Sequence, residues 1–298
     1  MKALVEVAIG LIFSQRQVLV GWREAKQHQG NKYEFPGGKL EPGESAVQAC
    51  RREILEEVGV DIQLWHPFEW IEHDYADVVV RLHVFFAVLD AEQAQQVKQP
   101  WQWYERKELQ HLNFPKANAE IIERLSWPTD LKVSQHIAEL DHVEASTLFY
   151  FRPEQWTDAE TQAVMNMPPT KHAQLILNEA HWKTFAQPNL KLAAIHLKHS
   201  QLMQKTKGDL VVGQRYIAAC HNEESLKHAQ SIGCEAMLFS PILATPSHPN
   251  TQALGWQYAQ QVLQNIHLPV FALGGMRPET LPQAQHYGFY GVAGVSAF

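Results

Sequence analysis

Three glutamates at helical spacing are the residues of this chain most able to do chemistry. Glu53, Glu56 and Glu57 lie three and four positions apart, so on an α-helix their carboxylates share one face within about 6 Å of their neighbours. Like charges at that spacing destabilise a bare helix, and a divalent cation relieves the repulsion. Mg²⁺ prefers oxygen ligands together with waters and substrate phosphates. The group therefore predicts a site for Mg²⁺, or for Mn²⁺ in its place, with Arg52 able to hold one carboxylate.

A helix over residues 46–58 is expected to position these carboxylates. Ser45 follows the acidic turn of residues 41–44 and can cap the first turn, while Gly59 suits a left-handed helix end. The opposite face should supply a core contact through Val47, Ile54, Leu55 and Val58.

The glutamates belong to a longer pattern, G-x5-E-x7-R-E-U-x-E-E-x-G-U, where U is aliphatic, and residues 38–60 fill all nine fixed positions. This segment resembles the signature of the Nudix hydrolases, which split nucleoside diphosphates linked to another group. A solvated acidic helix laced by Arg51 and Arg52 is the alternative interpretation. The turn of residues 35–38, with two adjacent glycines, and the terminal Gly59 favour the metal site.

Three further segments, residues 21–23, 31–39 and 114–118, are similar to MutT-type 8-oxo-dGTP diphosphatases. The resemblance implies purine contacts by Arg23, Phe35 and Asn118, whose guanidinium, aromatic face and amide suit a purine. Alternatively, Asn118 caps the last helix of this region and Phe35 is a core residue.

The resemblance also implies a mechanism in which water attacks a phosphorus of the diphosphate bridge. Glu53, Glu56, Glu57 and the carbonyl of Gly37 would hold the metal, and Glu53 would orient or deprotonate the water. Arg52 and Glu44 would support the catalytic group, and Gly38 and Lys39 would contact substrate. The expected reaction converts 8-oxo-dGTP into 8-oxo-dGMP and pyrophosphate, which sanitises the nucleotide pool and protects DNA replication fidelity.

Two positions depart from the MutT pattern. Its arginine in the strand near residues 77–79 is absent, and Arg81 follows instead. The loop of residues 95–100 lacks the expected glutamate, so the last metal ligand stays unidentified.

Composition describes an ordinary globular chain of 298 residues, with 45% hydrophobic residues and a net charge of −7. Without a strongly basic field, a duplex nucleic acid partner is disfavoured. Three scattered cysteines, Cys50, Cys220 and Cys234, suggest core residues in a reducing compartment. With no signal peptide and no membrane span, we expect a cytoplasmic enzyme.

Two domains are expected, at residues 1–126 and 130–298, separated by Trp127-Pro128-Thr129. In the first, a mixed sheet between helices, an α/β/α sandwich, is predicted. Its expected strands are residues 4–13, 17–22, 65–73, 78–90 and 102–104, with a late helix at 118–125.

The second region alternates eight strands with helices, which predicts a TIM-barrel-like (β/α)8 domain that lacks its last helix. A partner subunit or the first domain would then cover the side of the barrel where that helix is missing. The protein could therefore be an oligomer. The expected strands are residues 131–134, 147–152, 173–177, 192–197, 216–220, 236–240, 268–273 and 291–296; the expected helices include 159–165, 223–232, 252–265 and 278–286.

This barrel resembles thiamine-phosphate synthases and their TenI-like relatives, through segments at the predicted strand ends such as residues 175–179, 219–222, 240–249 and 273–276. The resemblance implies a phosphate pocket built from Arg152, Asn178, Thr245, Ser247, His248, Gly275 and Ser296.

The synthase pattern is eroded: Glu179 replaces an Asp, Lys198-His199-Ser200-Gln201 replaces a magnesium-binding segment, and His248 replaces a lysine. The open alternatives are a synthase or isomerase serving the thiamine pathway with the first domain, a sensor of thiazole phosphate or thiamine phosphate, and a structural remnant.

Overall fold

The computed structural model of the protein describes residues 2–24, 30–185, 190–245, 251–295 and 298. The chain divides into two compact units, Met1–Trp127 and Pro128–Phe298. The division falls between the two domain ranges expected from the sequence. Each unit is described by itself.

The first unit contains a seven-stranded sheet and its covering helices. In chain order the elements are β1 (Ala3–Ser14), β2 (Gln17–Arg23), β3 (Lys32–Glu34), β4 (Gly37–Lys39), α1 (Ala46–Glu57), β5 (His66–Asp74), β6 (Val78–Val88), α2 (Ala91–Ala94), β7 (Gln102–Glu105), the 3-10 helices η1 (Arg106–His111) and η2 (Lys116–Asn118), and α3 (Ala119–Leu125).

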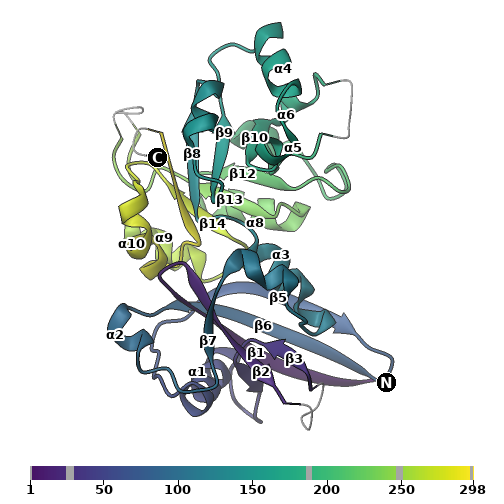
Figure 1. Ribbon diagram of the computed structural model, residues 1–298, viewed down its shortest axis with the longest axis vertical. Helices are drawn as coiled ribbons and strands as arrows, with labels where there is room; N and C mark the ends of the chain where they lie inside the picture. The colour runs from purple at the N-terminus through teal and green to yellow at the C-terminus, as the bar shows by residue number, and fades with distance from the viewer. Residues whose placement is uncertain (1, 25–29, 186–189, 246–250, 296–297) are drawn as a thin grey trace. The chain divides into compact units, whose positions relative to one another are not determined.

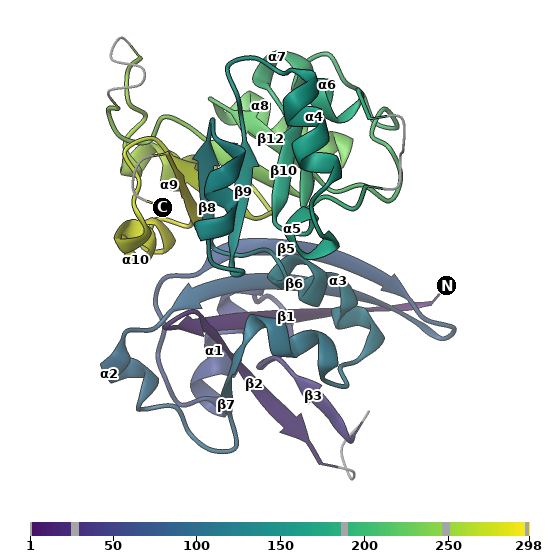
Figure 2. The same cartoon turned by 45° about the horizontal axis from the view of Figure 1, so that its top comes forward.

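The sheet is mixed, as predicted. Its order is β3-β2-β1-β6-β5, with β4 added beside β1 and β7 beside β2. Strands β1 and β6 run parallel over eleven paired residues, whereas the other pairs are antiparallel. Helices α1 and α3 lie against opposite faces of this sheet (Figures 1 and 2).

Helix α1 packs on the sheet by a different face from the one expected. Ile54 and Val58 are fully buried, as predicted, but Val47 and Leu55 are 41% and 46% exposed. The core side is completed by Ala49 and Cys50, which lie about one helical turn before Ile54. Leu55 is rotated by about 100° from Ile54 on the helix, so it points away from the sheet, and Val47 stays exposed in the first turn.

Two short strands were not expected from the sequence. Strand β3 pairs with β2, and β4 consists of Gly37, Gly38 and Lys39, paired antiparallel with β1 from Val7 to Ile9. Glycine is depleted in strands because it contributes no side chain to packing. The Gly-Gly segment was therefore predicted as a turn, although its backbone completes the sheet beneath α1.

The second unit is a closed barrel of eight parallel strands. Its elements are β8 (Asp130–Ser134), η3 (Ile137–His142), β9 (Thr147–Phe151), α4 (Asp158–Met165), α5 (Pro169–His172), β10 (Leu175–Asn178), α6 (Glu179–Trp182), β11 (Ala194–Leu197), α7 (His199–Leu202), β12 (Tyr216–Cys220), α8 (Glu223–Ile232), β13 (Ala236–Phe239), α9 (Trp256–Leu263), β14 (Val270–Leu273), η4 (Pro278–Thr280), α10 (Leu281–His286) and β15 (Gly291–Gly294).

All eight predicted barrel strands are present, and the order β10 to β15 followed by β8 and β9 closes the ring. The first crossover is short, since the described chain between β8 and β9 forms only the 3-10 helix η3. Within the described residues no helix follows β15, in agreement with the expected fold. Helix α9 begins at Trp256, later than predicted, because Gly255 has a positive φ of 79°.

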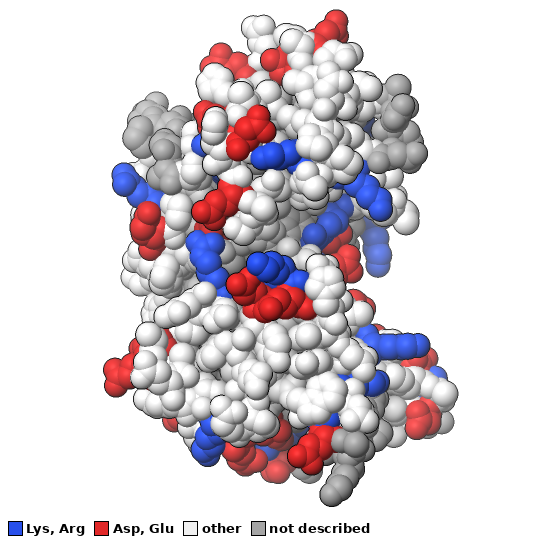
Figure 3. All heavy atoms as spheres, viewed as in Figure 1, with Lys and Arg blue, Asp and Glu red and all other residues white. Residues whose placement is uncertain are grey.

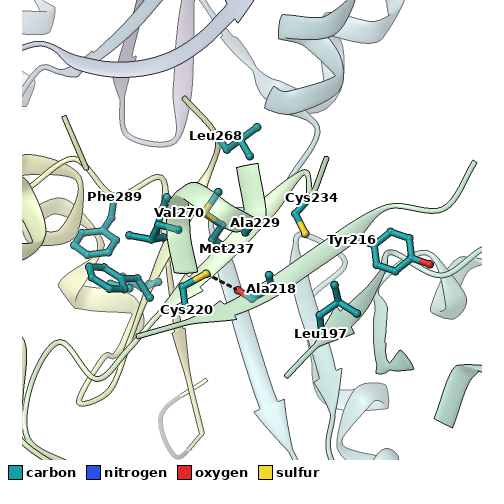
Figure 4. Close-up of a cluster of buried hydrophobic side chains, with 14 of the residues drawn as sticks. Leu197, Tyr216, Ala218, Cys220, Ala229, Cys234, Met237, Leu268, Val270 and Phe289 are labelled. Carbon is teal, nitrogen blue, oxygen red and sulfur yellow. Dashed lines mark hydrogen bonds between the residues drawn. The ribbon is translucent and has the colours of Figure 1, made fainter. Parts of the chain in front are cut away.

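The barrel core is apolar, and Figure 4 shows part of it with Cys220 and Cys234 among aliphatic and aromatic side chains. Cys50, Cys220 and Cys234 are all buried and unbridged, as expected. Burial raises the pKa of the Cys234 thiol to about 12, so it stays protonated. These cysteines therefore behave as small core residues.

The surface carries mixed charge. Figure 3 shows acidic and basic side chains interspersed over the coloured part of the face in view. None of the described helices combines the length and apolar character needed to cross a bilayer.

Candidate active site

The ends of helix α1 fix where its carboxylates point. The N-terminus is closed by a capping box, in which the Ser45 side chain accepts from the Gln48 backbone N–H and the Gln48 side chain accepts from Ser45 N at 2.8 Å. At the other end Gly59 has a φ of 81° and donates to the carbonyl of Ile54 at 3.2 Å. The helix therefore begins and ends as the sequence predicts.

Strand β4 brings the two adjacent glycines directly against this helix. A Cβ added to Gly38 would lie 2.2 Å from the carboxylate carbon of Glu53, so any side chain there would displace that carboxylate. The backbone N–H of Gly37 donates to Glu57 Oε2 at 3.1 Å. Gly38 therefore allows the backbone to approach the Glu53 carboxylate, whereas at Gly37 a Cβ would lie 2.1 Å from the carbonyl oxygen of Ala8 in β1.

Arg52 is the positive centre of the acidic group. Its Nε and Nη2 donate to the two carboxylate oxygens of Glu44 at 3.0 and 2.9 Å, a bidentate pair. Its Nη1 donates to Glu53 Oε1 at 2.8 Å and lies 3.9 Å from Glu56 Oε2, and Nη2 also reaches the carbonyl of Lys39 at 3.2 Å. The guanidinium therefore hydrogen-bonds Glu44 and Glu53 and forms a longer ion pair with Glu56.

Glu57 lies in the most perturbed environment of the group. Glu57 is exposed at the surface, yet the protein atoms around its carboxylate displace enough water to raise the pKa of this carboxyl to about 7, and the nearby charges of Glu34 and Glu53 act in the same direction. The Gly37 N–H and Arg23 oppose this shift. Sequence reasoning did not assign Glu34, although its position just before the glycine turn could have indicated it.

Only some of the oxygen atoms at this site are placed to coordinate a hard cation. Glu53, Glu57 and the Gly37 backbone lie together and offer oxygen atoms, the ligand type that Mg²⁺ prefers. Glu56 is 62% exposed at its side chain. Across the described residues, no three His, Cys, Asp or Glu side chains are gathered closely enough to hold a metal ion. Glu53 and Glu57 therefore fit the predicted metal site, and Glu56 would have to move inward to join them.

The three predicted purine contacts have different surroundings. Arg23 is ion-paired with Glu34, next to the acidic group. Phe35 is 4% exposed and stacks on Phe114 with ring centroids 4.9 Å apart, so one of its faces is already covered. Asn118 is buried at the start of α3, yet its side chain makes no capping hydrogen bond there. The capping interpretation of Asn118 therefore lacks its hydrogen bond, whereas Phe35 is largely a core residue.

Residues at the two departures from the MutT pattern make contacts of their own. Arg81 pairs with Glu72 at 2.9 Å and Glu6 at 3.3 Å on neighbouring strands and lies over the Trp70 ring. In the loop without a glutamate, the aliphatic stem of Lys98 packs beside Gly59. Lys39 is exposed in β4.

In the barrel, a cavity of about 890 Å³ lies at the carboxyl ends of the strands. Of the residues expected to bind phosphate, Arg152, Thr245 and Gly275 line this cavity. Ser247, His248 and Ser296 lie outside the described residues.

Asn178 does not line the cavity. It is 2% exposed, and its amide donates to the carbonyl of His196 at 3.1 Å and to Gln201 Oε1 at 2.8 Å while accepting from Ala180 N. The neighbouring Glu179 is buried and paired with Lys205 at 2.8 Å and Lys183 at 3.2 Å. Both side chains therefore stabilise the start of α6, and the structure separates Asn178 from the expected phosphate pocket.

Comparison with known proteins divides the chain in the same way. A family model described as NUDIX domain matches residues 8–124, and one described as thiamine monophosphate synthase matches residues 144–298.

Relatives of the first unit include an 8-oxo-dGTP diphosphatase of Escherichia coli, 35% identical over 127 residues, which cover 42% of this chain and 98% of the relative. A CTP pyrophosphohydrolase of the same organism is 29% identical over 40% of this chain and 87% of its own length.

A thiamine-phosphate synthase is also similar to part of this chain. A protein of Aquifex aeolicus with the provisional name thiamine-phosphate synthase 2 is 38% identical over 80 residues, or 27% of this chain and 43% of that protein.

The close approach at Gly38 generates a first prediction. Gly38→Ala should displace the Glu53 carboxylate and weaken Mn²⁺ binding by about tenfold or more, as expected when the support of a ligand is removed. The clash involves the end of a flexible side chain, so the fold should persist. Gly43→Asn is the matched control, because a Cβ at Gly43 meets nothing within 4 Å and asparagine tolerates its positive φ. Equal Mn²⁺ affinity in both variants, measured by calorimetry, would argue against the proposed site.

The raised pKa of Glu57 predicts proton-linked metal binding. Below pH 7 the Glu57 carboxyl is mostly protonated and must release its proton to bind a cation, so Mn²⁺ affinity should rise about tenfold from pH 6 to pH 8. Glu57→Gln should remove this dependence. Glu56→Gln should lower the affinity but keep the slope. A wild-type affinity that is constant over this pH range would refute the linkage.

Proposed function

Because this chain belongs to the Nudix family through residues 8–124 and to the thiamine monophosphate synthase family through residues 144–298, we propose that its first domain is a magnesium-dependent nucleoside triphosphate pyrophosphohydrolase. Its proposed substrate is 8-oxo-dGTP, which it converts into 8-oxo-dGMP and pyrophosphate. This reaction would remove an oxidised precursor before it enters DNA.

The contact between α1 and β4 carries the proposal. The Glu53 carboxylate lies against Gly38, the Glu57 carboxylate accepts from the backbone N–H of Gly37, and Arg52 donates to Glu53. Such a narrow, acidic, backbone-lined site suits a cation together with the phosphates that it carries. A solvated acidic helix would not need the two glycines.

The chain's own residues would divide the work as follows. Glu53, held by Arg52, orients or deprotonates the attacking water. Glu44 keeps the guanidinium of Arg52 in place through two hydrogen bonds. Lys39, exposed in β4, contacts a phosphate. A metal ion held by Glu53, Glu57 and the Gly37 carbonyl, with Glu56 recruited, would supply charge neutralisation on the phosphate oxygens.

Purine recognition is proposed for Asn118 and Arg23. The side-chain amide of Asn118 makes no helix-capping hydrogen bond. Such an amide can both donate to and accept from a purine edge. Arg23 is ion-paired with Glu34, which lies near the acidic group, so its guanidinium would contact the purine close to the phosphate site. Phe35 would act by supporting the pocket wall with Phe114, since its ring is already stacked.

A second candidate is suggested by the barrel joined to this domain. A diphosphate of the thiamine pathway would place both domains in one process, since the second unit is similar to a thiamine-phosphate synthase. The relative that acts on CTP adds a pyrimidine nucleotide as a competing substrate for the first domain.

Initial rates on a substrate panel test the proposal. We expect kcat/KM with Mg²⁺ to be highest for 8-oxo-dGTP among 8-oxo-dGTP, dGTP, dATP, CTP and thiamine diphosphate. Glu53→Gln should lower turnover by about 10²-fold or more without loss of fold, whereas Glu92→Gln, an exposed glutamate of α2, should not. Highest activity on thiamine diphosphate or CTP would reject the purine assignment.

The amide of Asn118 gives a separate prediction. Asn118→Ala should raise KM for 8-oxo-dGTP by about tenfold, the effect of one buried hydrogen bond, and should change KM for CTP much less. Asn166→Ala, at an exposed helix end in the barrel, serves as the control. Equal increases for both nucleotides would reduce Asn118 to a structural residue.

A further inference from the structure

The barrel cavity is bordered by side chains from successive strand ends. Arg152 follows β9, Lys198 follows β11, His221 follows β12 and Arg277 follows β14, and all four line the cavity. The cavity volume of about 890 Å³ falls within the usual range for small-molecule sites. Ligands of parallel barrels bind at this end of the strands.

The border of this cavity carries positive charge without acidic partners. Arg152, Lys198 and Arg277 line it, whereas no aspartate or glutamate is found among its described lining residues. Among the described residues none of these three cations forms an ion pair, in contrast to Lys205 and Lys183, which share Glu179. Three like charges around one cavity repel each other, and a bound anion would relieve that repulsion.

The floor of the cavity is polar but uncharged. Tyr150 and His196 stack with ring centroids 4.3 Å apart and share a hydrogen bond of 2.9 Å between the Tyr150 hydroxyl and His196 Nδ1. Burial lowers the pKa of His196 to about 3, and the charges of Arg152 and Lys198 act in the same direction. His196 is therefore neutral at physiological pH, and the net charge of the cavity comes from its border.

The orientation of His221 follows from its partner. Its Nδ1 lies 2.8 Å from the carbonyl oxygen of Ser240, which can only accept, so Nδ1 carries a proton. The ring of His199 lies 5.1 Å away, centroid to centroid. These two rings provide further polar contacts between the charged border and the floor.

We propose that the barrel cavity holds the phosphate groups of its ligand by direct contact with Arg152, Lys198 and Arg277, in place of a divalent cation. Mg²⁺ requires oxygen ligands, chiefly carboxylates, and the described border supplies none. Arginine and lysine instead neutralise phosphate charge through hydrogen bonds of their own. Occupancy of the barrel is therefore independent of the metal that the first domain is proposed to need.

Calorimetric titration of the full chain with inorganic pyrophosphate in the presence of EDTA tests this inference, and inorganic phosphate in a parallel titration distinguishes a monophosphate site from a diphosphate site. We expect one pyrophosphate bound per chain. Lys198→Gln and Arg277→Gln should each weaken binding by about tenfold, as expected for loss of one charge-assisted contact. Both side chains are exposed, so both variants should fold.

Lys227→Gln is the matched control, because Lys227 is exposed on α8 and paired with Glu223 outside the cavity. Its pyrophosphate affinity should equal that of the wild type. The inference is overturned if pyrophosphate binds only after Mg²⁺ is added. It is overturned equally if binding in EDTA is unaffected by Lys198→Gln and Arg277→Gln.

Discussion

The repulsion among carboxylates on one helix is the constraint on which the first domain's site depends. Glu53 and Glu57 are held within reach of each other only because α1 is fixed at both ends and packed against β4. Arg52 offsets part of this repulsion by pairing with Glu44 and Glu53. The pKa of Glu57 is nevertheless raised, first by desolvation of its carboxylate and then by repulsion from Glu34 and Glu53. A site built in this way is ready to accept positive charge.

The helix that carries these carboxylates was predictable because its determinants are local. The glutamate spacing, the Ser45 cap and Gly59 all act within one helix, so they can be read from neighbouring residues. Strand β4 could not be predicted in the same way, since its partner β1 lies about 30 residues earlier and glycine carries no strand signal. Leu55 was predicted to be a core contact and is exposed for a related reason, because the face of a helix that becomes buried depends on the sheet against which it packs.

In the barrel, strand positions were predictable and side-chain roles were not. Hydrophobic runs mark each buried strand, and all eight were found. Asn178 ends such a strand, as a ligand-binding residue could, yet its amide joins β10 to β11, to Gln201 of α7 and to the start of α6. Lys198 and Arg277 gave no motif signal, because their importance arises from the absence of acidic partners around the cavity, which only the folded chain reveals.

The products formed from 8-oxo-dGTP test the central claim most directly. Phosphorus NMR of the reaction with the full chain and Mg²⁺ should show pyrophosphate and the nucleoside monophosphate, and no turnover once the metal is removed by EDTA. Release of inorganic phosphate with the nucleoside diphosphate, or an unchanged rate in EDTA, would contradict a metal-dependent pyrophosphohydrolase built on Glu53 and Glu57.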